Sequence, residues 1–123
     1  MTPIIDTQSF AAATRADRAI LLLDARWSMP SRRAAATVEA WEQDRLRRAA
    51  HPRVPIFVAR ADDQYPPAVL AWLTGQGLAA HSSTGWGEVF WLERGRVVEQ
   101  LLFKPTADEL TRRTLERWGA HLV

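Results

Sequence analysis

The sequence contains no cysteine, and this absence excludes every function that depends on a thiolate of this chain. Long apolar runs are also missing, because no stretch reaches the roughly 20 apolar residues that a transmembrane helix needs. Residues 1–6 lack the basic start and the apolar segment of a signal peptide. We therefore expect a cytoplasmic protein that does not bind a membrane.

Lysine is nearly absent as well, since Lys104 is the only one and arginine supplies the other basic side chains. The formal net charge is only +2, although the sequence pI is about 9.9. Arginines cluster at residues 45–53, but the acidic side chains of residues 39–44 lie beside them. A nucleic-acid-binding surface normally shows a dense basic stripe interleaved with aromatic side chains. The mixed charge pattern therefore argues against a nucleic-acid partner.

What the chain does contain suits a single domain over residues 1–123. Hydrophobic residues make up 47% of its 123 residues, and 6 tryptophans and 4 phenylalanines supply bulky core side chains. The charged fraction of 24% is ordinary, which argues against a disordered chain. No internal repeat, low-complexity tract or linker divides the sequence.

Helical and strand patterns alternate along the chain. The apolar run at residues 19–23 is typical of a strand that is buried on both faces. Pro30 suits the first turn of a helix, and Thr106 with Glu109 fits a capping box. We expect helices from a cap at residue 6 or 7 to residue 16, over 30–50, over 66–74 and from 106 onward. We expect strands at 18–25, 54–61, 88–93 and 96–103, with a tight turn at 94–95 and a short first strand at 3–5.

This order places two strand–helix–strand crossovers before a hairpin and a final helix. Crossovers join parallel strands, whereas a hairpin joins antiparallel ones. The sequence therefore predicts a three-layer α/β sandwich, whose mixed central sheet of four to five strands carries helices on both faces. Leu46 is expected on the apolar face of the long helix. Four tryptophans at helical or strand positions are expected in the core: Trp41, Trp72, Trp91 and Trp118.

Residues 27–31, Trp-Ser-Met-Pro-Ser, lie between the second strand and the long helix and resemble the Trp-Cys-x-Pro-Cys active site of thioredoxin. Residues 21–27 are similar to the family's second strand and active-site loop. Residues 60–63 are similar to its Asn-x-Asp after the third strand, and residues 89–96 to its Leu-Phe-Lys-Asn-Gly-Glu hairpin. The chain thus resembles the thioredoxin-like superfamily, as a divergent member without either active-site cysteine.

Departures from the family pattern determine what the resemblance implies for chemistry. Ser28 and Ser31 stand where the family has its two cysteines. Leu22 falls on the position of its buried acid, and Gly87 on that of its cis-proline. A serine hydroxyl is not ionised near neutral pH, and two hydroxyls form no reversible covalent pair. The resemblance therefore implies a retained fold and a lost redox activity.

The resemblance also implies a binding surface, because the family receives a substrate polypeptide in a groove at its active site. Trp27 and Trp86 match residues that border this groove, and Met29 lies between the serines. Tryptophan supplies much of the binding energy in protein interfaces, and methionine adapts its shape. We predict a redox-inactive protein-binding module, either an adaptor, a complex subunit or an assembly chaperone, that binds another protein, a peptide or a second copy of itself. The predicted former active-site surface comprises Trp27, Ser28, Met29, Pro30, Ser31, Trp86 and Gly87.

Alternative interpretations of the two serines stay open. Ser31, Arg32 and Arg33 begin a helix, where backbone N–H groups favour an anion such as a carboxylate or phosphate, or glutathione. The ordinary role of a serine at that place, however, is an N-cap. A serine-based transferase would need an adjacent base, and His81 is the histidine that could approach Ser28.

Two further expectations concern the indoles and metals. Trp27 and Trp86 either line the former active-site surface or fold inward to complete the core. No cofactor and no metal are expected, because the histidines are scattered and no ligand spacing repeats. The adjacent carboxylates of Asp62 and Asp63 point apart and suit a polar turn.

Overall fold

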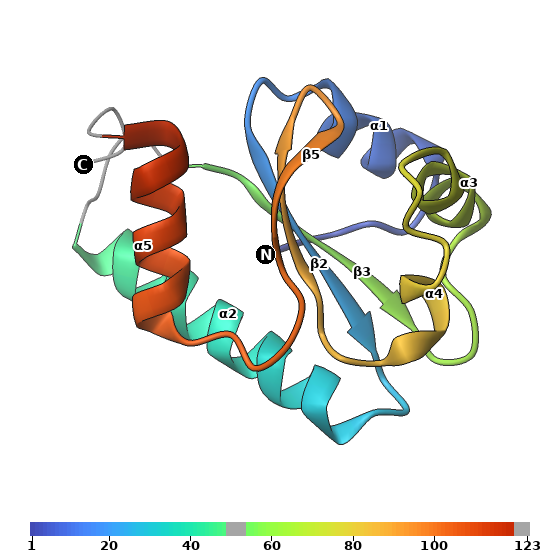
Figure 1. Cartoon of the computed structure of the whole chain (residues 1–123), viewed down its shortest axis with the longest axis horizontal. Coiled ribbons are helices and arrows are strands. Elements are labelled where there is room, and N and C mark those ends of the chain that lie inside the picture. The colour runs from blue at the N-terminus through green and yellow to red at the C-terminus, as the bar shows by residue number, and fades with distance from the viewer. Residues whose placement is uncertain (49–53, 120–123) are drawn as a thin grey trace.

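The computed structural model describes residues 1–48 and 54–119, and these residues form one five-stranded sheet with helices on both faces (Figure 1). The strands are β1 (Thr2–Pro3), β2 (Ala19–Ala25), β3 (Ile56–Ala61), β4 (Val89–Glu93) and β5 (Arg96–Leu101). The helices are α1 (Thr7–Arg15), α2 (Met29–Arg47), α3 (Pro67–Gly75), α4 (His81–Thr84) and α5 (Ala107–Trp118).

The sheet has the order β1-β3-β2-β4-β5, with β2 at its centre. β2 pairs in parallel with β3, with Leu22 opposite Val58, and antiparallel with β4, with Leu22 opposite Val89. β1 is parallel to β3, and β5 is antiparallel to β4. Every residue of β2 is buried, as its unbroken apolar run predicts. The expected mixed sheet is confirmed.

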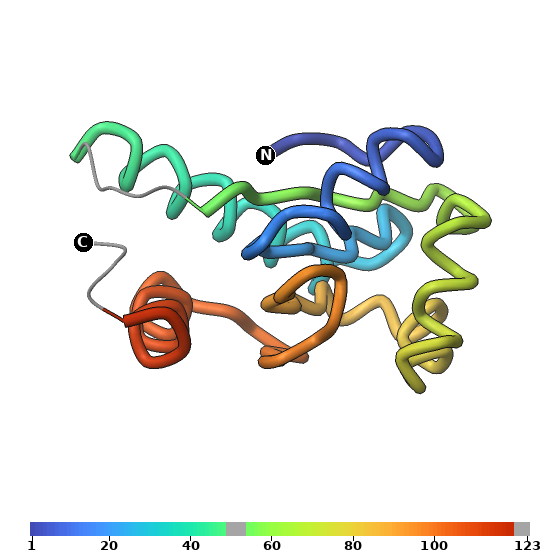
Figure 2. Tube along the Cα trace, turned by 90° about the horizontal axis from the view of Figure 1, so that it is seen from above, coloured from blue at the N-terminus to red at the C-terminus, as the bar shows by residue number. Residues whose placement is uncertain are grey.

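Side chains of β2 alternate between two hydrophobic cores, because successive strand residues point to opposite faces. Leu21 and Leu23 pack with α1 and α3 in the first core. Ile20 and Leu22 pack with α2 and α5 in the second core. Figure 2 shows α3 and α5 at opposite ends of the molecule, with the strands between them. Of the four tryptophans expected in the core, Trp41, Trp91 and Trp118 are buried, and Trp72 packs half-buried against the first core.

Side-chain caps begin three of the helices at the predicted places. The Asp6 carboxylate accepts a hydrogen bond from the Ser9 N–H at the start of α1. Ser28 caps α2, and the Thr106 hydroxyl accepts from the Glu109 N–H at the start of α5. No helix built from the described residues is long and apolar enough to cross a membrane.

Several details differ from the sequence-based expectations. The first strand covers Thr2–Pro3 instead of residues 3–5. The short helix α4 was not expected. Leu46 is 43% exposed rather than part of the apolar face, because Trp41 is the last buried residue of α2 and Leu46 lies beyond it. β5 ends at Leu101, so residues 102 and 103 are not part of the strand. The expected end of the long helix at residue 50 lies outside the described residues.

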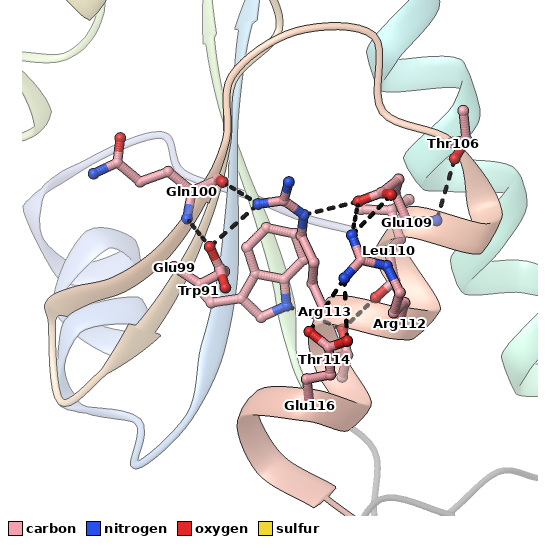
Figure 3. A network of polar contacts seen from close by, with 10 residues as sticks. All are labelled: Trp91, Glu99, Gln100, Thr106, Glu109, Leu110, Arg112, Arg113, Thr114 and Glu116. Atoms are coloured by element: carbon pink, nitrogen blue, oxygen red, sulfur yellow. Dashed lines mark hydrogen bonds and ion pairs between the residues drawn. The ribbon is translucent and has the colours of Figure 1, made fainter.

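Side chains cover part of the outer edge of β5, which among the described strands pairs with β4 alone (Figure 3). The Arg113 guanidinium donates to the Gln100 carbonyl at 2.6 Å and to the Glu99 carboxylate at 3.2 Å. Glu99 also accepts from the Gln100 N–H at 3.1 Å, and Gln76 accepts from the Val97 N–H at 3.2 Å. An edge strand with free N–H and C=O groups invites pairing with another strand. These contacts occupy three of the backbone groups of β5 that such pairing would use, the Val97 N–H, the Gln100 N–H and the Gln100 carbonyl.

Candidate functional site

The former active-site surface lies at one end of the sheet, where β2 ends and β4 begins. Because β2 and β4 are antiparallel neighbours, the segment after β2 meets the segment before β4. The Leu23 N–H donates to the Glu88 carbonyl at 2.9 Å. The Ser28 hydroxyl donates to the Gly85 carbonyl. Residues 27–31 and residues 85–88 are therefore joined directly.

Gly87 packs against the start of α2 more closely than any other residue type allows. A Cβ atom on Gly87 would lie 2.4 Å from the Ala34 Cβ and 3.0 Å from the Ser31 Cα. Its φ of +76° is also in the left-handed region that side chains disfavour. The Trp86–Gly87 segment thus lies beside Ser28 and Ser31, where the resemblance to thioredoxins places it.

Large apolar side chains are exposed around this junction. Trp27 is 48% exposed, Met29 52% and Trp86 42%, so neither indole folds into a core. The Trp86 and Phe103 rings meet edge to face, with centroids 6.3 Å apart, and Phe103 is 48% exposed. We call Trp27, Met29, Trp86 and Phe103 the exposed apolar patch.

The two serines differ in accessibility. Ser28 is half-buried, and its hydroxyl accepts the Ser31 N–H at 3.5 Å as the N-cap of α2. Ser31 is fully buried, and its hydroxyl accepts the Ala25 N–H at 2.7 Å and lies 3.3 Å from the Asp24 carboxylate. The prediction that the Ser31 side chain lies on the binding surface is therefore wrong, because this side chain holds the end of β2 against α2.

The anion site expected at the start of α2 gains no support from these contacts. The Ser31 N–H already donates to Ser28, so it does not face a ligand. Arg32 and Arg33 are exposed and form no ion pair with any residue that the structure describes. Anion binding there stays a prediction.

A buried acid pairs with a histidine beneath Trp86. Glu88 is fully buried, and one carboxylate oxygen lies 2.9 Å from the His81 Nδ1 and accepts from the Thr84 hydroxyl. The His81 ring packs edge to face on Trp86 and on Phe90, at 6.2 and 6.0 Å between centroids. The contact with Glu88 therefore holds the His81 ring in the position in which it packs against Trp86.

A second buried carboxylate lies at the end of β2. Asp24 is 2% exposed, and it accepts from the Arg60 guanidinium and the Ser31 hydroxyl, each at 3.3 Å. Burial raises the pKa of the Tyr65 hydroxyl, and the negative charges of Glu88 and Asp24 raise it further. Among described residues, neither the Tyr65 hydroxyl nor the second carboxylate oxygen of Glu88 has a hydrogen-bond partner.

These polar groups do not form a nucleophilic pair. His81 packs against Trp86, but its Nδ1 faces Glu88, and the Ser28 hydroxyl donates to the Gly85 carbonyl. No hydrogen bond joins His81 to Ser28 within the described chain, so a serine nucleophile has no base there. The described residues also contain no group of three histidine or acidic side chains placed to hold a metal ion.

Sequence reasoning missed several members of this site. No local sequence pattern indicated that three polar side chains are buried here, because their burial depends on residues far away in the sequence. These side chains are Asp24, Tyr65 and Glu88. Phe103 was assigned to the end of a strand, although it follows β5 and contacts Trp86. The shared end of β2 and β4 was the available signal, since residues beyond both strands must meet there.

Neither a known family model nor a curated protein matches the sequence. Solved structures do match. A mutant thioredoxin from Halobacterium salinarum NRC-1 has a TM-score of 0.63 at 15% identity, covering 94% of this chain and 88% of its own. The oxidised thioredoxin from Plasmodium falciparum gives 0.55 at 14% identity, covering 97% and 98%. Another Plasmodium falciparum thioredoxin structure gives 0.58 at 15% identity, covering 96% and 99%.

These similarities confirm the predicted fold. The chain is a thioredoxin-like α/β protein whose mixed five-stranded sheet carries helices on both faces, and it has no cysteine. At 14 to 15% identity the similarity establishes the architecture alone. Any function must therefore be argued from the residues of this chain.

Proposed function

We propose that this cysteine-less, thioredoxin-like domain binds another protein through the exposed apolar patch. The observation that carries the proposal is the patch itself: two tryptophans, a methionine and a phenylalanine are exposed together at the junction of β2, α2 and β4. Exposed apolar groups that gather on one surface are typical of interaction sites. Tryptophan in particular is enriched among the residues that dominate binding energy.

The polypeptide beneath the patch is held firmly, which lowers the entropy cost of binding. The Ser28 hydroxyl joins the Trp27 loop to Gly85, and Gly87 fits directly against α2. His81 supports Trp86 from below through its contact with the ring. The aromatic side chains are therefore presented from fixed backbone positions, as a preorganised interface requires.

The chemistry of the surface favours binding over catalysis. No thiol is present, and the Ser28 hydroxyl donates to a backbone carbonyl instead of a base. The buried carboxylates face His81, Thr84, Ser31 and Arg60 rather than the exposed side chains. An adaptor, a subunit of a larger complex and an assembly chaperone are all forms of this proposed function.

The test compares three baits in a pull-down from lysate of the native host. The first is the wild-type chain, and the second carries Trp27→Ala with Trp86→Ala. The third carries Leu46→Ala, a matched control that removes a similarly exposed apolar side chain near the other end of α2. We expect a protein that the wild type and the control capture and the double variant loses.

Two outcomes contradict the proposal. A partner that all three baits retain would move the interface away from the patch. If no bait enriches any protein over empty resin, the protein-binding function itself fails. Thermal unfolding of each bait, followed by circular dichroism, verifies beforehand that the variants are folded.

A further inference from the structure

A groove of about 230 Å³ adjoins the exposed apolar patch between α2 and the segment that leads from β5 to α5. Pro30, Ala34 and Pro105 form part of its wall. Pro30 directly follows Met29, and Lys104 directly follows Phe103, so two lining residues of the groove are chain neighbours of two patch residues. A groove of this size is smaller than a typical pocket for a small molecule and suits a single apolar side chain.

The rim of the groove carries positive charge only. Arg33 and Lys104 are its charged lining residues, and both are exposed. The Lys104 ammonium lies 5.2 Å from the centre of the Phe103 ring, over its face. Neither cation forms an ion pair with a residue of the described ranges 1–48 and 54–119. Two uncompensated cations beside an apolar groove are complementary to a carboxylate next to an apolar side chain.

The charges beside Trp27 are mixed. The Arg26 N–H donates to the Ala61 carbonyl at 2.9 Å, and the exposed acids Asp62 and Asp63 follow Ala61 directly. Positive charge near Arg26 is therefore accompanied by carboxylates, whereas the groove side has none among its lining residues. A negatively charged partner should therefore bind near Arg33 and Lys104, where no carboxylate among the lining residues offsets the positive charge.

Resting on the proposed function, we infer that the partner segment is an acidic peptide with one large apolar residue. The apolar side chain occupies the groove between Pro30 and Pro105, and one or two neighbouring carboxylates pair with Arg33 and Lys104. The peptide continues over Phe103 and Trp86. Nucleic acid and anionic membranes fit less well, because the groove is lined by two cations and both of these partners need a broader set.

Selection from a random peptide display library on the immobilised chain of residues 1–123 tests this inference. Selected peptides are then synthesised with a fluorescent label and titrated by anisotropy against four proteins. These are the wild type, Arg33→Glu with Lys104→Glu, Trp86→Ala, and a control that carries Arg96→Glu with Arg117→Glu. The control makes the same change in net charge at exposed positions away from the groove.

We expect selected peptides to contain Asp or Glu beside Leu, Phe, Ile or Met. Reversing both groove charges should weaken their binding roughly tenfold or more, while the control should change it by less than about threefold. Exchanging the acids of the peptide for lysine should restore binding to the groove variant. Raising the salt concentration should weaken binding to the wild type and not to that variant.

The outcomes separate the inference from the function on which it rests. Peptides that need Trp86 but tolerate reversal of Arg33 and Lys104, or that are neutral or basic, overturn the acidic-peptide inference and leave the docking function standing. If the library yields no binder above the uncoated surface, both fail. Binding of an oligonucleotide or of phosphatidylserine vesicles through Arg33 and Lys104, without peptide binding, also overturns the inference.

Discussion

Two buried oxygen atoms without partners distinguish the interior of this protein. The Tyr65 hydroxyl and one oxygen of Glu88 are inaccessible, and neither forms a hydrogen bond with a described residue. A buried polar atom without a partner destabilises the folded state by about 1–3 kcal/mol. Burial raises the pKa of the Tyr65 hydroxyl, and the negative charges of Glu88 and Asp24 raise it further. The hydroxyl therefore keeps its proton at pH values well above the ordinary pKa of a tyrosine.

Tyr65→Phe tests this environment at the level of one atom. At pH 7 we expect the variant to be as stable as the wild type or more stable, because only an unpartnered hydroxyl is removed. Above pH 10 the unfolded wild type loses the phenolic proton while the folded state retains it. The free energy of unfolding of the wild type should therefore fall by about 1.4 kcal/mol per pH unit more steeply than that of the variant.

Urea unfolding from pH 7 to 11 measures this difference. Tyr65 is the only tyrosine, so tyrosinate absorbance reports its ionisation without ambiguity. Parallel pH dependences for the two proteins, or a native absorbance change near pH 10, would show that Tyr65 ionises as freely in the folded as in the unfolded state.

For single residues, the sequence predicted which residues lie close together better than it predicted which side chains are buried. The approach of Gly87 to Ser31 followed from the resemblance, because it depends on which strands are neighbours. The burial of Ser31 did not follow, since a serine at a helix start looks the same whether its hydroxyl faces solvent or the end of β2. The burial of Glu88 was not predicted either, because it depends on α4, which covers Glu88 and was itself not expected.

Among the helices and strands, the sequence predicted those with a regular pattern of apolar residues and missed the one without such a pattern. β2 and α2 have long, regular patterns, and both form where expected. α4 has only four residues and no apolar period, so nothing in its sequence indicated a helix. The groove beside the patch arises between α2 and a loop, and such spaces between elements are invisible to local patterns.

The contact between the loop before β4 and α2 predicts a strong effect of Gly87→Ala. The new Cβ would collide with Ala34, and the left-handed backbone would be strained. We expect the free energy of unfolding to fall by at least about 2 kcal/mol. Gly75→Ala is the matched control, because nothing lies within 4 Å of the place that its new methyl group would occupy and its backbone is helical.

Urea titrations of both glycine variants give the comparison. The control should be neutral or slightly more stable, since alanine favours a helix over glycine. Equal effects of the two substitutions would mean that Gly87 is not packed against α2, and the position of Trp86 beside Ser28 would then be wrong.

Closure of the β5 edge by α5 predicts a different consequence for Arg113→Ala. Removing the guanidinium frees the Gln100 carbonyl, and it leaves Glu99 without its ion pair to Arg113. An opened edge strand offers its backbone to a second chain. We expect association that increases with concentration in sedimentation velocity, whereas the wild type should not associate.

Arg112→Ala is the control for this experiment, because it removes the neighbouring arginine of the same helix. Among the described residues, its guanidinium pairs with Glu109 and Glu116 on α5 and with no residue of β5 (Figure 3). Association of both variants to the same extent would assign the effect to lost charge rather than to the opened edge.

For the whole molecule, charge and symmetry argue against self-association through the exposed apolar patch. Arg32, Arg33 and Lys104 lie beside the patch, and all three are exposed. A two-fold dimer brings the same surface of both copies together, so these cations would face one another.

We therefore expect a monomer of 13.9 kDa at micromolar concentration, most clearly at low salt, where repulsion between the cations is least screened. Sedimentation velocity of the wild type and of Trp27→Ala with Trp86→Ala should give the same single species. A dimer that the double variant loses would assign the patch to a second copy of this chain, and the acidic partner would then have to bind elsewhere. A monomer leaves the tryptophans exposed and the cations unpaired in the free protein, which is the state in which a partner of opposite charge gains most from binding.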